Sequence, residues 1–240
     1  MKRLLESADH LLIGGHRGCE CEYPENSIAA MAEGICRGAD YLEIDIQLTK
    51  DGIPIVFHDV RLEERTSLSG YVHEFCYRQL KGAIPGLCTL TEAMEWGRGQ
   101  QINFALEIKT VPLEMQKYSF QLVGKMAAII REMDMQEYVY VFGIDYQVLQ
   151  YLHTCAPEIM IGLIVPHVPA DPVKLMTEMH AAVYLSYIYQ MTPEIIKDLH
   201  AHGFFVSGAI LRDEKWVYYA RTLGVDMFES DNPEKYFIAH

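Results

Sequence analysis

Residues 14–59 read GGHRGCECEYPENSIAAMAEGICRGADYLEIDIQLTKDGIPIVFHD. Near the middle, residues 41–48 have the alternating pattern of a β-strand, in which successive side chains leave opposite faces. Glu43 and Asp45 therefore leave the same face, with Cα atoms about 6 to 7 Å apart. The other face is aliphatic: Leu42, Ile44, Ile46 and Leu48.

This strand has two possible environments. One face acidic and one face apolar is typical of a strand at the surface of a half-solvated sheet. Gly38 and Ala39 before the strand and the apolar run 53–57 after it favour a buried position instead. Two unneutralised carboxylates are costly inside a protein, so a buried position implies a bound cation. The hard-cation preference for oxygen makes metal ligation the favoured interpretation.

Several short motifs in this region occur together in a fixed order. They are His16-Arg17-Gly18, Pro24-Glu25-Asn26-Ser27, Gly38-Ala39-Asp40, Glu43-Ile44-Asp45, Thr49-Lys50-Asp51-Gly52 and His58-Asp59. The combination resembles the glycerophosphodiester phosphodiesterase family over about forty-five residues, and its specificity comes from order and spacing rather than from any single tripeptide.

Strand-like and helix-like segments alternate along most of the chain, which predicts a parallel sheet. Eight strand positions fit a single (β/α)8 TIM-type barrel over 1–240, with a doubly wound sheet as the alternative. The resemblance favours the barrel. The strands are expected at 11–15, 41–48 continuing through 53–58, 102–109, 139–143, 160–165, 182–187, 204–209 and 226–230. Helices are expected at 27–37, 90–97, 114–133, 146–154, 172–179, 193–202 and 214–223.

Residues 60–85 interrupt the alternation with a polar, turn-rich composition and are predicted to form a short insertion after the second strand.

The segment 102–109 has the same alternating pattern of side chains as residues 41–48. It sends Glu107 and Lys109 inward near the carboxyl end of its strand, which is the end of a barrel where active sites lie. On the residues alone, an exposed ion pair on the strand is the favoured interpretation of Glu107 and Lys109. The resemblance instead implies one divalent cation, Mg²⁺ or Ca²⁺, held by Glu43, Asp45 and Glu107. It also implies that Arg17 and Lys109 face the substrate phosphate and that His16 and His58 form the catalytic acid–base pair, with neither role assigned.

The charges of these residues are consistent with that site. Three carboxylates, a divalent cation, the two basic side chains and a singly charged phosphodiester sum to zero. Without cation and substrate the side chains sum to −1, so a cation or a proton is expected even in the resting site. Asn26 is expected to cap the helix that begins at Ser27, with orientation of the His16 loop as its second possible role.

Composition narrows the class of protein. A formal charge of −13 over 240 residues argues against nucleic acid and anionic membranes as partners. No apolar run approaches the ~20 residues of a membrane span, and no signal peptide is recognised, so a cytoplasmic location is expected. The six cysteines lack metal or disulfide spacing and are expected to be free thiols. The histidines outside the motifs are interpreted as surface or loop residues.

The second half departs from the family pattern at two places. Gly143-Ile144-Asp145 stands where the family has Ser-Phe-Asp, and Ser207-Gly208-Ala209-Ile210 stands where it has Trp-Thr-Val-Asn. An aromatic wall and a polar amide are thus missing, and Tyr184, Tyr187 and Tyr189 are candidate replacements. The closing Ser230-Asp231-Asn232-Pro233 matches again.

The leading hypothesis is hydrolysis of small glycerophosphodiesters to glycerol 3-phosphate and an alcohol. A lysophospholipase D-type activity is a second hypothesis, which requires an apolar lip that only 60–85 could supply. A non-catalytic glycerophosphate-binding module is the third. Retention of both His16 and His58 argues against it, because binding alone needs no proton-transfer pair. The sequence does not indicate an oligomeric state.

Overall fold

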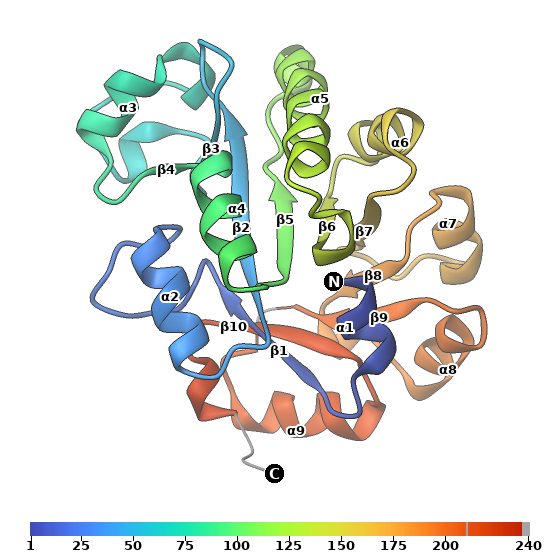
Figure 1. Ribbon diagram of the computed structural model, residues 1–240. Helices are drawn as coiled ribbons and strands as arrows, with labels where there is room; N and C mark the ends of the chain where they lie inside the picture. Colours follow the sequence, from blue (N-terminus) through green and yellow to red (C-terminus); the bar gives the residue numbers. More distant parts are fainter. Residues whose placement is uncertain (210, 237–240) are drawn as a thin grey trace.

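Eight parallel strands close into a barrel in the computed structural model, which describes residues 1–209 and 211–236 (Figure 1). The ring closes because β1 (Leu12–His16) pairs with β10 (Met227–Ser230) on one side and with β2 (Tyr41–Leu48) on the other. The predicted barrel is confirmed, and the doubly wound alternative is excluded. The remaining barrel strands are β5 (Phe104–Ile108), β6 (Val139–Gly143), β7 (Met160–Ile164), β8 (Val183–Ser186) and β9 (Phe205–Gly208).

Helices surround the barrel and bury its outer apolar faces, as predicted for each of the seven segments (Figure 1). Local sequence signals set their ends. Thr192 accepts a hydrogen bond from the Ile195 amide at the start of α8, and Gly224 ends α9 in the left-handed region at φ 77°. The helices are α2 (Ile28–Cys36), α4 (Leu90–Gly99), α5 (Gln116–Glu132), α6 (Tyr146–Cys155), α7 (Pro172–Glu178), α8 (Pro193–Ala201) and α9 (Glu214–Leu223).

Residues 53–58 are not a continuation of the second strand, and that expectation was wrong. A tight turn reverses the chain, with Gly52 at φ 75° and the Thr49 amide bonded to the Ile53 carbonyl. Strand β3 (Pro54–Val56) therefore runs antiparallel to β2, and β4 (Cys88–Thr89) adds to its far edge. The turn delivers His58 back to the mouth of the barrel.

The insertion 60–85 is a packed unit rather than an open loop. It contains two 3₁₀ turns, at Leu62–Glu64 and Val72–Glu74, and helix α3 (Tyr77–Ala83). No helix was predicted in this segment, yet its apolar side chains point inward and pack on β3. The resulting cluster consists of Ile55, Phe57, Leu62, Val72, Leu80, Ile84 and Leu87.

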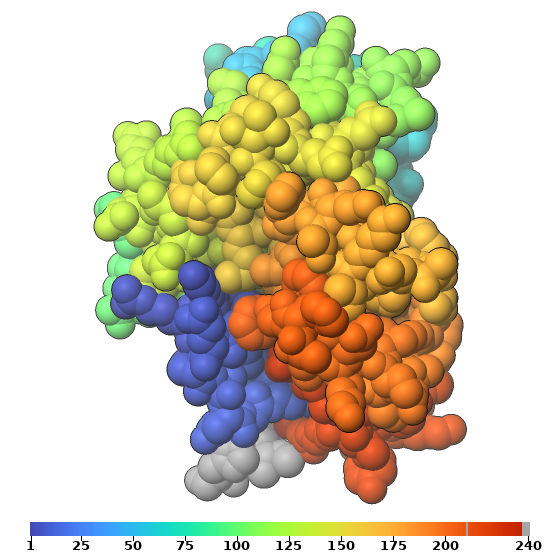
Figure 2. All heavy atoms as spheres, turned by 90° about the vertical axis from the view of Figure 1, so that its right-hand side faces the viewer, coloured from blue at the N-terminus to red at the C-terminus, as the bar shows by residue number. Residues whose placement is uncertain are grey.

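The barrel interior below the site is filled by large side chains. Tyr41 and Tyr140 are fully buried there, and Gly14 and Gly162 make room for them, since an added Cβ would lie 2.4 Å from Tyr41 and 2.8 Å from Tyr140. Helix α1 (Lys2–Ser7), which the sequence patterns did not predict, packs Met1 and Leu5 against this cluster. Figure 2 shows this blue N-terminal segment lying against the orange segments of the second half.

Within the described part of the chain, no helix combines the length and apolar character needed to cross a bilayer. The prediction of a single domain over all of 1–240 stays a prediction. Ile210 and His240, both considered above, lie outside the described residues.

Close backbone contact seats helix α2 against the loop that carries His16. A Cβ at Gly34 would lie 2.3 Å from the Gly18 carbonyl oxygen, and Gly18 itself has φ 91°. Gly124, in the exposed middle of α5, has no such neighbour within 4 Å. The same substitution at these two helical glycines therefore separates steric cost from helix propensity.

We expect Gly34→Ala to lower the free energy of unfolding by roughly 1–3 kcal/mol because it overpacks the contact with Gly18. We expect Gly124→Ala to raise it by about 0.5–1 kcal/mol through helix propensity and a smaller unfolded-state entropy. Denaturant unfolding of both variants under one buffer measures the difference, and equal effects would contradict it.

Candidate active site

Three carboxylates meet where β2 and β5 end. Glu43 and Asp45 project from β2, and Glu107 projects from β5, where it is in register with Asp45. One oxygen from each lies within 4.8 Å of the others. Glu43 Oε1 and Asp45 Oδ1 are buried without a hydrogen-bond partner, although Lys109 Nζ approaches Asp45 Oδ1 to 3.2 Å. Oxygen ligands with unfilled coordination are what Mg²⁺ or Ca²⁺ requires, so this trio fits a divalent cation.

The protonation of the trio follows from crowding. Burial and repulsion from Asp45 and Glu107 hold the pKa of Glu43 well above its usual range. Burial also works against ionised Asp45, but Lys109, His58 and Arg17 outweigh it and lower that pKa. A carboxyl with a raised pKa beside one with a lowered pKa means that Glu43, rather than Asp45, is the member of this pair that binds a proton more readily.

Basic and amide groups surround Asp45 closely. Lys109 Nζ lies 2.8 Å from Glu107 Oε1, and Arg17 Nε lies 3.5 Å from Asp45 Oδ2. The Asn26 amide donates to Asp45 Oδ2 at 2.8 Å, and its carbonyl oxygen accepts from the Asp45 backbone amide. Asn26 was expected to cap the helix, and that expectation was wrong. Ser27 caps α2, while Asn26 adopts φ 61° and orients Asp45.

His16 is fixed by a carboxylate from the other end of the chain. Its Nδ1 donates to Asp231 Oδ1 at 2.6 Å, and its Nε2 lies 3.9 Å from Glu43 Oε2. Arg212 Nε binds the second oxygen of Asp231 at 2.5 Å. Burial opposes ionisation of Asp231, but the hydrogen bonds from His16 and Arg212 prevail and lower its pKa to about 2. The imidazole thus presents Nε2 to the carboxylate trio.

His58 is fixed in a corresponding way from within its own segment. Its Nδ1 donates to Asp59 Oδ1 at 2.6 Å, and Arg65 Nε binds Asp59 Oδ2 at 3.0 Å. Gln47 on β2 donates to the carbonyl oxygens of Phe57 and Asp59 and so holds the loop. The described residues therefore contain two histidine–aspartate–arginine chains, one through His16 beside Glu43 and one through His58, whose charge acts on Asp45 and Glu107.

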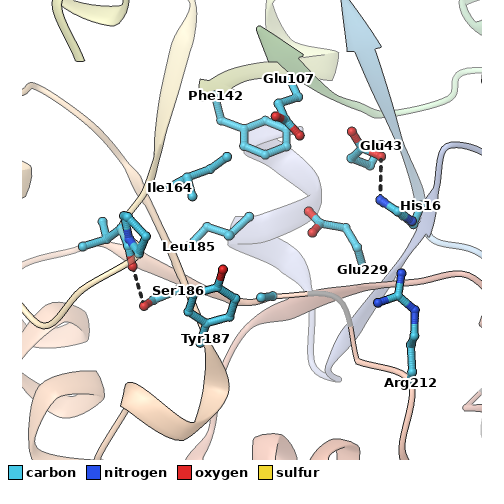
Figure 3. A pocket seen from close by; sticks show the side chains of 13 residues that line it. His16, Glu43, Glu107, Phe142, Ile164, Leu185, Ser186, Tyr187, Arg212 and Glu229 are labelled. Carbon is cyan, nitrogen blue, oxygen red and sulfur yellow. Dashed lines mark hydrogen bonds and ion pairs between the residues drawn. The ribbon is translucent and has the colours of Figure 1, made fainter. Parts of the chain in front are cut away.

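A cavity of about 260 Å³ opens beside the trio (Figure 3). His16, Glu43 and Glu107 line one side of it, while the opposite side is largely apolar. Glu229, a fully buried residue of β10, projects between the two sides. The apolar side consists of Phe142, Ile164, Val165, Pro166, Leu185, Tyr187 and Ala209.

The sequence analysis missed three acidic residues of this region. Asp59 and Asp231 lay within quoted motifs, but nothing local indicated that they would hold the two histidines. Glu229 had a usable signal, because alternation along the expected strand 226–230 places Met227 and Glu229 on the inner face together. Among the other histidines, His73 is buried against Tyr118 instead of lying at the surface.

The described geometry matches one family. The model of the glycerophosphoryl diester phosphodiesterase family matches residues 16–235, almost the whole chain. The chain belongs to this family. Glycerophosphodiester phosphodiesterases of Bacillus altitudinis and of Caldanaerobacter subterraneus subsp. tengcongensis are 28% and 26% identical to it. Each alignment covers 93% of this chain and 95% of the relative.

Solved structures agree on the fold. A phosphodiesterase of Oleispira antarctica in complex with the product sn-glycerol-3-phosphate superposes with a TM-score of 0.85 at 24% identity, covering 93% of this chain and 94% of that one. Membership in the family makes the chain a phosphoric diester hydrolase.

Local structural roles are visible at both places where the chain departs from the family pattern. At the first, the retained Asp145 caps helix α6 by accepting from the amides of Gln147 and Val148. Ser207 is fully buried in β9 and donates to the Gly208 carbonyl. Tyr187 lines the cavity. Tyr189 stacks on the Tyr187 ring from outside the cavity, and Tyr184 packs in the core.

Glu229 generates a pH-dependent prediction for the cation-free protein. Burial and repulsion from Glu107 and Asp45 raise the pKa of Glu229 from 4.5 to about 8. The folded protein therefore takes up a proton that the unfolded chain lacks, and the associated stability is lost as pH rises from about 4.5 through about 8.

In EDTA, we expect Glu229→Gln to raise the melting temperature by about 5 °C or more at pH 9, where the wild-type carboxylate is charged and buried. At about pH 4 the difference should be much smaller, since the carboxyl is then protonated in both the folded and the unfolded protein. Calorimetry across this range checks the result. An equal difference at both pH values would show that the carboxylate is not destabilised by burial.

Proposed function

We propose that the chain hydrolyses small glycerophosphodiesters to glycerol 3-phosphate and an alcohol, with one divalent cation, Mg²⁺ or Ca²⁺, and a histidine pair. The observation that carries the proposal is the pair of aspartate-held histidines beside an oxygen trio in this family's fold. The cation held by Glu43, Asp45 and Glu107 would stabilise negative charge on the phosphodiester.

The protein's own groups supply the proton transfers. Asp231 and Asp59 each accept a hydrogen bond from the Nδ1–H of their histidine, which leaves Nε2 of His16 and of His58 to exchange protons with substrate. One neutral imidazole removes a proton from the attacking hydroxyl or water, while the other, protonated, donates to the departing oxygen. Arg212 and Arg65 bind the second oxygens of the aspartates and hold them in place.

Arg17 and Lys109 are assigned to the substrate phosphate. Both side chains are largely buried and keep their charge, because the neighbouring carboxylates offset the cost of burial and raise their pKa values. Arg17 adopts φ 52°, which directs its amide to Glu43 at 3.0 Å and its guanidinium over Asp45. A phosphodiester arriving at the trio would meet both cationic groups.

Neither alternative is favoured. A lysophospholipase D-type activity requires an apolar lip, but the apolar side chains of the insertion 60–85 pack inward on one another and on β3. A binding module without catalysis has no use for two imidazoles, each held by its own aspartate.

Release of glycerol 3-phosphate from a panel of glycerophosphodiesters tests the proposal. We expect EDTA to abolish release, and Mg²⁺ or Ca²⁺ to restore it. His58→Ala should lower kcat by about 10²- to 10⁴-fold because a general acid–base group is lost. His202→Ala, which removes an exposed histidine at the end of α8, is the control and should retain full activity. Absence of product from every diester would refute the proposal.

The orienting role of Asn26 gives a prediction that does not depend on turnover. We expect Asn26→Ala to weaken Mg²⁺ or Ca²⁺ binding by about tenfold, because Asp45 loses the amide that positions it. Calorimetric titration of the cation measures this. Asn103→Ala, at the opposite end of β5, is the matched control. Unchanged affinity in both variants would place the cation away from Asp45.

A further inference from the structure

Glu229 is the one charged group of the cavity to which the proposed reaction gives no task. It is 4% exposed, and its Oε1 has no hydrogen-bond partner. It stands outside the trio of Glu43, Asp45 and Glu107. Figure 3 shows its carboxylate at the centre of the cavity, between the trio and the side formed by Phe142 and Leu185. A buried, unpartnered carboxylate aimed into a cavity indicates a ligand that satisfies it.

The charge of that ligand follows from the lack of a positive partner for Glu229. A divalent cation at the trio would lower the pKa of Glu229 from its cation-free value, so that all four buried carboxylates count as ionised. Arg17, Lys109 and that cation balance the four carboxylates, and one imidazole protonated as the general acid balances a phosphodiester. None of these protein groups forms an ion pair with Glu229 within residues 1–209 and 211–236. A positively charged group on the substrate would pair with Glu229 directly.

The shape and chemistry of the opposite side select among cations. Phe142, Ile164, Leu185 and Tyr187 offer ring faces and methyl groups. The Ser186 hydroxyl in this wall already donates to the Val165 carbonyl at 2.6 Å. A polyol head group would find few hydrogen bonds there. Aromatic faces attract organic cations, and a methylated ammonium group needs no hydrogen bonds from its surroundings.

We propose that Glu229, together with Phe142 and Tyr187, forms a subsite for the positively charged head group of a zwitterionic glycerophosphodiester, with a quaternary ammonium group as its best ligand. The inference rests on the proposed function, because it names the substrate class for the same cavity. Glu229 supplies the charge, and the two rings supply a surface that contacts the methyl groups.

An uncharged isostere of the substrate isolates the contribution of charge. Glycerophosphocholine and the 3,3-dimethylbutyl ester of glycerol phosphate have the same shape and differ by one positive charge. We expect wild-type kcat/KM to favour the choline ester by about tenfold or more, as electrostatic and cation–π contacts of 1.4 kcal/mol or more would give. In Glu229→Gln this ratio should fall to about twofold or less, through loss with the choline ester alone.

Two further variants sharpen the comparison. Phe142→Leu keeps an apolar wall but removes the ring face, so it should also reduce the preference for choline. It tests the subsite independently if Glu229→Gln does not fold. Glu178→Gln removes one negative charge from an exposed ion pair on α7 and should leave the preference unchanged.

The outcomes separate the subsite from the reaction. Equal losses with both esters in Glu229→Gln, or no wild-type preference for choline, would overturn the subsite while leaving the hydrolase intact. If no diester is cleaved, the reaction fails, and calorimetric titration with choline and with 3,3-dimethylbutanol still tests the subsite. Choline should then bind the wild type more tightly than its isostere does, and Glu229→Gln should abolish the difference. No difference in the wild type would overturn the inference.

Discussion

Repulsion among buried carboxylates at one end of the barrel is the constraint on which the site depends. Glu43, Asp45, Glu107 and Glu229 all project inward from parallel strands. The basic side chains that pair with them in the described part of the chain are Arg17, Lys109 and, when protonated, His16. Burial of unbalanced charge is expensive, so the fold tolerates this arrangement only with bound protons or cations. The raised pKa values of Glu43 and Glu229 express the same cost. Affinity for positive charge is therefore built into the barrel mouth.

The packing around the mouth serves to keep that charge in place. Tyr41 and Tyr140 fill the barrel beneath it, where Gly14 and Gly162 leave them space, and the backbone contact of Gly18 with Gly34 anchors the His16 loop. On the other side, the insertion buries its own apolar cluster and thereby supports the segment that carries His58 and Asp59. Rigid support of this kind is what the proposed reaction requires of two imidazoles acting on one substrate.

The barrel and the meeting of three carboxylates at its mouth could be predicted from the sequence, because both follow from local periodicity. Alternation along β2 and β5 alone places Glu43, Asp45 and Glu107 on the inner face. The features that local periodicity could not predict arise from contacts between distant segments. The sequence around Asn26 is typical of a helix cap, but its side chain binds Asp45, nineteen residues further along the chain. The chain reversal at Gly52 likewise depends on the pairing of β3 with β2. The role of Asp231 required knowing that β10 closes the ring beside β1.

The hydrogen bond between His16 and Asp231 joins residues 215 positions apart. Asp231 directly follows β10, so His16 gains this partner only when β10 has paired with β1. The orientation of an imidazole near the start of the chain is therefore fixed by the last strand to join the ring, and closure of the barrel and placement of His16 are one event.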